Sequence, residues 1–141
     1  MKKSFAISLF LTAALLIGAA CTKTINSVSM GKPIATVTVN NLTATVSNAT
    51  GQLKSGDQEV TLAFMDSSGK PVDVGAVSLN LHMPAMGGMA AMNEAVNLTT
   101  TNTPGVYSGK VTVPMAGEWQ GQLAFEGPAG KGKATFSVTA R

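Results

Sequence analysis

The sequence predicts an all-β protein, a single antiparallel immunoglobulin-like β-sandwich of about seven strands that follows a signal peptide. Three observations support this prediction. Apolar and polar residues alternate with a period of two from residue 34 onward, β-branched residues are frequent, and turn-forming residues recur at regular intervals. No window keeps the three-to-four-residue spacing of an amphipathic helix. We therefore assign the sandwich domain to residues 34–141.

The segment before this domain has the pattern of a secretory signal. Lys2 and Lys3 precede an apolar run over residues 5–17, and small residues then lead to Cys21, the only cysteine. The run is shorter than the roughly 20 apolar residues that a membrane-spanning helix needs. We predict a signal peptide over residues 1–20, and the alternative is an uncleaved anchor.

Residues 17–21, IGAAC, resemble a bacterial lipobox, with Gly18 where that pattern most often has leucine. The resemblance implies cleavage before Cys21 and acylation of this residue, because several acyl chains together give stable membrane attachment. The expected product is a membrane-anchored lipoprotein that faces the periplasm or the cell exterior. Acylation would consume the only thiol, and polar residues 21–33 would form a tether.

The expected strands are separated by turn segments, among them SSGKP at residues 67–71 and NTPG at residues 102–105. Their alternate apolar side chains should face a common interior. The strands are expected at residues 42–46, 58–66, 76–82, 95–99 (the weakest), 106–113, 118–126 and 133–140. Trp119 is in phase with Leu123 and Phe125, which predicts a place in the core.

Charge and composition exclude several classes of function. Without Lys2 and Lys3 the formal net charge falls from +3 to +1, and no basic cluster suggests nucleic-acid binding. The chain has one histidine, and its three aspartates and four glutamates show no paired-carboxylate pattern. Neither a nucleophile elbow nor a phosphate-binding loop is present, so we do not expect an enzyme.

The segment LHMPAMGGMAAM, residues 81–92, contains the only histidine and four of the eight methionines. Strand phase places Leu81 and Met83 on the core face and His82 on the polar face. Pro84 ends the regular strand. Met86, Met89 and Met92 are therefore expected on a loop or at its exit, where an extended conformation or a bend at residues 87–88 can gather them.

Such a cluster favours a soft metal ion. The thioether is an uncharged soft ligand suited to Cu(I), and by the same argument to Ag(I), while imidazole accepts copper in either oxidation state. We predict a site formed by Met86, Met89 and Met92 with His82. Met83 and Met115 are weaker candidates, because both are in phase with core residues. The methionines could instead form a surface for a protein partner, pack beneath the loop, or reflect composition alone.

Residues 60–139 resemble the FixH/YtkA-like domains. The resemblance is carried by GKPV at residues 69–72, MPAMG at 83–87, PGVY at 104–107 and PMAG at 114–117 before Trp119. It implies an extracytoplasmic immunoglobulin-like domain, found as a lipoprotein beside copper-handling and heavy-metal efflux systems. Many members carry a histidine soon after the Met-Pro-x-Met-Gly piece, where this chain has Gly88 and Met89. This departure favours a methionine-dominated site.

The expected function is therefore that of a lipid-anchored protein that binds Cu(I) and takes part in copper or heavy-metal handling or delivery. The transmembrane helix of the FixH type is lacking, which makes a role inside an inner-membrane assembly complex a weaker expectation. The alternative is a protein-interaction module of the cell envelope, for example a partner of an efflux adaptor, that uses the methionine loop as its contact surface without metal.

Overall fold

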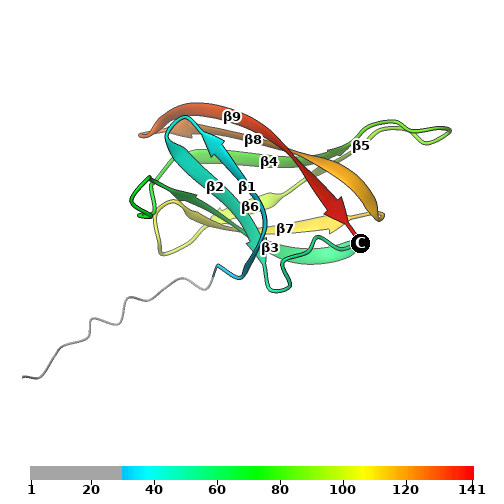
Figure 1. Cartoon of the computed structure of the whole chain (residues 1–141), viewed down its shortest axis with the longest axis horizontal. Helices are drawn as coiled ribbons and strands as arrows, with labels where there is room; N and C mark the ends of the chain where they lie inside the picture. The colour runs from blue at the N-terminus through cyan, green and yellow to red at the C-terminus, as the bar shows by residue number, and fades with distance from the viewer. Residues whose placement is uncertain (1–29) are drawn as a thin grey trace, which may run out of the picture.

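The structure, a computed structural model, describes residues 30–141; the signal segment, Cys21 and most of the tether lie outside the described residues. It confirms the all-β sandwich (Figure 1). No helix in the described part of the chain is long and apolar enough to cross a membrane. The strands are β1 (Lys32–Val39), β2 (Leu42–Asn48), β3 (Gly56–Met65), β4 (Ala76–Met83), β5 (Met92–Ala95), β6 (Asn97–Thr100), β7 (Val106–Val113), β8 (Gly117–Gly127) and β9 (Gly130–Ala140).

The strands form two antiparallel sheets. One has the order β1-β2-β3-β7-β6 and the other the order β5-β4-β8-β9. In the first sheet, β2, β3, β7 and β6 correspond to strands A, B, E and D of immunoglobulin domains. In the second sheet, β4, β8 and β9 correspond to strands C, F and G, and β5 is added beside β4. The predicted immunoglobulin-like architecture is therefore confirmed, and β1 extends the first sheet by one strand.

Nine strands are described where about seven were predicted, and the weak strand expected at residues 95–99 accounts for part of the difference. It is divided into β5, which pairs with β4, and β6, which pairs with β7 in the other sheet. Val96 lies between them with its side chain buried, and its N–H donates to the carbonyl of Leu79 at 2.9 Å. The chain thus changes sheets at one buried residue, which a period-two pattern cannot reveal.

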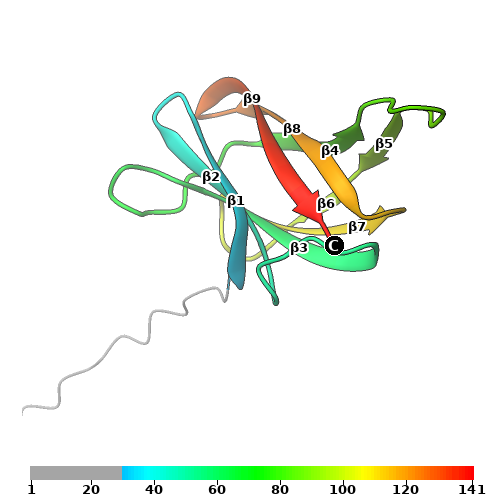
Figure 2. The same cartoon turned by 45° about the vertical axis from the view of Figure 1, so that its right-hand side comes forward.

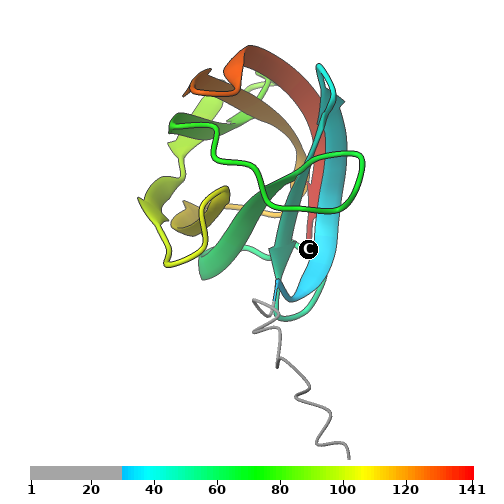
Figure 3. The ribbon, with the colours of Figure 1, turned by 90° about the vertical axis from the view of Figure 1, so that its left-hand side faces the viewer.

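One side of the sandwich is closed and the other carries a projecting hairpin. Strand β1 lies beside β9, so the two sheets meet along that side (Figure 3). On the opposite side the turn between β4 and β5 extends beyond the body of the sheets (Figures 1 and 2). The methionine-rich segment is located in this β4–β5 hairpin.

The core is formed by the inward-facing residues of both sheets. Phe64 in β3 packs edge-on against Phe125 in β8, with ring centroids 5.3 Å apart, and against Tyr107 at 6.1 Å. The buried Tyr107 hydroxyl donates to the carbonyl of Gly75 at 2.9 Å. Burial, with the negative charge of Asp73, raises the pKa of Tyr107. The aromatic rings thus pack the two sheets together, and the hydrogen bond to Gly75 holds the Tyr107 ring in place.

Glycine at position 105 is required by its surroundings. Its φ is 80°, and a Cβ there would lie 2.3 Å from the carbonyl oxygen of Val72. Gly69 has the same φ, but a Cβ there would meet nothing within 4 Å. A side chain at Gly69 would therefore have only the conformational cost of a positive φ, whereas one at Gly105 would also clash with the backbone.

We expect Gly69→Ala to lower the free energy of unfolding by about 1–2 kcal/mol, the cost of placing an L-residue in the left-handed region. Gly105→Ala should lose at least about 1 kcal/mol more, because the added methyl group must displace backbone atoms. Urea unfolding followed by Trp119 fluorescence measures both. Equal losses in the two variants would contradict the steric role of Val72.

Asp66 stabilises the turn after β3 through its carboxylate. Its Oδ1 accepts hydrogen bonds from Ser68 Oγ at 2.6 Å, from Ser68 N at 2.8 Å and from Lys70 N at 3.0 Å. These bonds, that from the Ser68 side chain first, lower the pKa of Asp66. Because the folded-state pKa is depressed, the contribution to stability is present above the unfolded-state value of about 3.9 and is lost as the pH falls through the folded-state value.

Asp66→Asn should accordingly be less stable than the unmodified chain at pH 7, and the difference should shrink as the pH falls below about 4. Urea unfolding at a series of pH values tests this. A difference that stays constant down to pH 2 would show that the charge of Asp66 does not contribute.

Candidate metal site on the β4–β5 hairpin

A row of polar side chains crosses the outer face of the four-stranded sheet. His82 in β4 lies opposite Asn93 in β5 and opposite Gln120 in β8, which in turn lies opposite Ser137 in β9. Leu81 and Met83, on either side of His82, are buried. The prediction that His82 lies on the polar face is therefore confirmed.

Asn93 fixes the orientation of the His82 ring. His82 Nδ1 lies 2.8 Å from Asn93 Oδ1, which also accepts a hydrogen bond from Asn80 Nδ2 at 3.5 Å. Because an amide oxygen only accepts, Nδ1 is the protonated nitrogen of the neutral ring. The lone pair on Nε2 is then available to a ligand.

The tip of the hairpin brings Met86 and Met89 together. Met86 N donates to Met89 O at 3.3 Å, and Met89 N donates to Met86 O at 3.0 Å. Gly87, at the first central position of the turn, has a φ of 57°, which glycine adopts without strain. Directly paired residues project from the same face of a hairpin, with Cβ atoms about 5 Å apart. The bend at the glycines therefore places the Met86 and Met89 side chains on the same face of the hairpin.

Met83 and Met92 form a second pair on the opposite face. They lie opposite each other in the β4–β5 ladder. Met83 is 2% exposed, whereas Met86 and Met89 are 53% and 46% exposed. Met92 was expected to be free of the core, but it is partly buried and packs against the core cluster. The four methionines are thus divided into an exposed pair and a core pair.

The exposed pair and His82 share one side of the sheet. His82 and Met86 line the same hollow of about 290 Å³. Glu118 and Gln120 of β8 and Ser137 of β9 form its other wall. Glu118 is the one charged side chain among these lining residues. Sequence reasoning did not select it, because nothing in the sequence indicates that β8 lies beside β4.

Met115 lies away from the hollow, whereas Trp119 is among the residues that line it. Met115 is partly buried and packs against the core, and its carbonyl accepts a hydrogen bond from Trp119 Nε1 at 3.2 Å. Trp119 is 1% exposed, as its strand phase predicted. Met115 is not among the residues lining the hollow. Cys21, the expected site of lipidation, lies outside the described residues.

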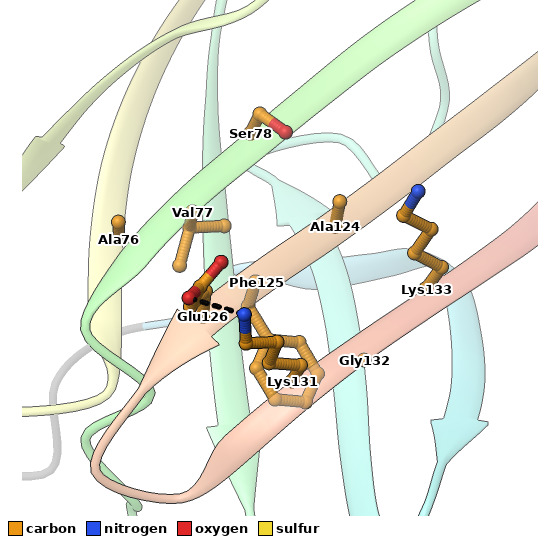
Figure 4. A pocket seen from close by; sticks show the side chains of 9 residues that line it. All are labelled: Ala76, Val77, Ser78, Ala124, Phe125, Glu126, Lys131, Gly132 and Lys133. Carbon is orange, nitrogen blue, oxygen red and sulfur yellow. Dashed lines mark ion pairs between the residues drawn. The ribbon is translucent and has the colours of Figure 1, made fainter.

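A larger hollow of about 500 Å³ lies at the other end of the same sheet (Figure 4). Glu126 and Lys131 form an ion pair of 2.6 Å across it, and Lys133 lines its edge. Neither sulfur nor imidazole lines it. Over residues 30–141 no group of three or more His, Cys, Asp or Glu side chains could hold a metal ion. A metal site with three or more protein ligands among the described residues would therefore need a residue of another type, such as methionine.

Comparison with known proteins identifies the family. The model of the YtkA-like family matches residues 36–124, more than half of the chain, from β1 into β8 and including the whole β4–β5 hairpin. No curated protein and no solved structure matches the chain. The chain therefore belongs to the YtkA-like family, as its sequence motifs indicated.

Proposed function

We propose that this chain is a lipid-anchored extracytoplasmic protein that binds Cu(I), or the similar ion Ag(I), through Met86 and Met89 with His82. The role is to hold or pass on copper in metal handling, and it is a binding role without catalysis. The observation that carries the proposal is the Met86–Met89 pair, which is exposed on the same side of the sheet as His82. Acylated Cys21 would attach the protein to the membrane.

The donor set is suited to this ion. Two thioethers and one imidazole are soft or borderline ligands without negative charge, and such ligands favour Cu(I) over harder cations. Met83, Met92 and Met115 are left out of the proposed site because they pack against the core. An envelope copper-handling or efflux protein would be the partner that receives or supplies the ion.

The alternative function is a protein-interaction module. Met86 and Met89 are the large hydrophobic side chains exposed among residues 30–141, and flexible methionine side chains suit an adaptable contact surface. The same two residues thus serve either proposal. Metal affinity separates the two functions.

An anaerobic Cu(I) titration against a competing chelator is the direct test. All variants carry Cys21→Ser so that no thiol competes for copper. Replacing both Met86 and Met89 by isoleucine should weaken binding by at least ~10-fold, since removal of even a supporting group costs this much at metal sites.

Met92→Ile is the matched control, because this residue lies in the same hairpin on the core side. It should bind Cu(I) as the parent does. If the parent binds no more tightly than the variant without Met86 and Met89, copper binding is rejected and the interaction module remains.

Oxidation of methionine provides a second test. In chloride-free buffer, hydrogen peroxide should convert Met86 and Met89 to sulfoxides before Met83, because their sulfur atoms are accessible. Ag(I) should slow oxidation at Met86 and Met89 and leave Met92 unaffected. Peptide mass spectrometry measures each site, and equal rates with and without Ag(I) would contradict the proposed site.

A further inference from the structure

The hollow beside the hairpin contains hard donor atoms as well as the Met86 thioether. We infer that His82 Nε2 and the Glu118 carboxylate form a Cu(II) site there, next to the thioether pair. The inference rests on the proposed function only in taking copper as the ion. The ligands of the Cu(II) site do not include the Met86 and Met89 thioethers. The chain would then bind copper in both oxidation states at adjoining positions.

The first ligand is oriented for this role. The hydrogen bond from His82 Nδ1 to Asn93 Oδ1 leaves Nε2 as the donor atom of the neutral ring. Histidine ligands of metal ions commonly donate their other ring N–H to an oxygen in this way, which fixes the tautomer and the ring. No other side-chain hydrogen bond involves His82 among residues 30–141. Asn93 is thus a positioning residue for His82.

The second ligand is adjacent on the neighbouring strand. His82 lies opposite Gln120, and Glu118 precedes Gln120 by two residues in β8, on the same face. Such diagonal neighbours lie about 7–8 Å apart, with somewhat shorter Cβ–Cβ distances, within reach of two side chains that converge on one ion. Both residues line the same hollow. The β4–β8 register therefore brings together an imidazole and a carboxylate that are far apart in the sequence.

The charge of the hollow favours a cation. Glu118 is exposed and forms no salt bridge with any residue in the described range 30–141. No lysine or arginine lines the hollow to neutralise it. At about 290 Å³ the hollow has room for an ion with several of its waters, each occupying about 30 Å³. A cation would therefore meet an unneutralised carboxylate in a space that keeps part of its hydration.

The chemistry of the pair selects Cu(II). Imidazole nitrogen and carboxylate oxygen suit the tetragonal geometry of Cu(II). Among the divalent ions of the first transition series, Cu(II) binds such ligands most tightly. The thioether of Met86 lines the same hollow. A thioether that suits Cu(I) and an imidazole–carboxylate pair that suits Cu(II) are thus neighbours.

Titration of the full-length Cys21→Ser chain with Cu(II), followed by electron paramagnetic resonance, tests the inference. We expect one bound ion with nitrogen hyperfine splitting. His82→Gln should remove the splitting, Glu118→Gln should weaken binding ~10-fold or more, and Asn93→Ala should keep the splitting but weaken binding ~10-fold. Binding that survives His82→Gln with an unchanged spectrum would overturn the inference.

Two controls make the result specific. Glu126→Gln removes a carboxylate from the outer face of the same strand, outside the hollow, and should leave the Cu(II) affinity unchanged. If Glu118→Gln has no larger effect than Glu126→Gln, the assigned carboxylate is wrong. The variant without Met86 and Met89 should lose Cu(I) and retain Cu(II), so failure of either site is recognised independently of the other.

Discussion

Burial of Leu79, Leu81 and Met83 between the two sheets is the constraint on which the candidate site depends. Successive residues of a strand face opposite sides, so these three side chains direct His82 to the outer face. A slip of the β4 register by one residue would bury His82 and expose the three apolar residues. The core therefore determines which donor atoms of β4 are available to solvent.

The same register continues to the tip of the hairpin. Met83 pairs with Met92, and the Met86–Met89 pair beyond it keeps this register without a bulge. Pairs three positions apart along a strand face opposite sides. Since Met83 and Met92 face the core, Met86 and Met89 face outward on the side of His82. One hairpin thus uses the same residue type for packing and for an exposed surface.

The outer face is polar but nearly uncharged around His82. The row formed by Asn93, His82, Gln120 and Ser137 consists of amide, imidazole and hydroxyl groups. Glu118 adds the one negative charge to the hollow between this row and Met86. Donor atoms of different softness therefore lie within one small region, while the opposite end of the sheet holds a Glu126–Lys131 ion pair.

Much of the fold could be predicted from the sequence. The period of two, the turn segments and the motifs shared with the family predicted the sandwich, the outward direction of His82 and the burial of Met83 and Trp119. The division of residues 95–99 into two strands could not be predicted, because the crossing at Val96 depends on a hydrogen bond to β4. Local alternation contains no information about which sheet a strand joins.

Some features of the candidate site could likewise be predicted from the sequence, and others could not. The sequence by itself determined the available donors, the phase of β4 and the place of the bend at residues 87–88, since each depends on local residue type and spacing. Only the tertiary structure decided that Met92 packs with Met83 and that Glu118 lies beside His82. Hairpin register and the order of strands in a sheet result from long-range packing, and these contacts connect residues that no local pattern relates.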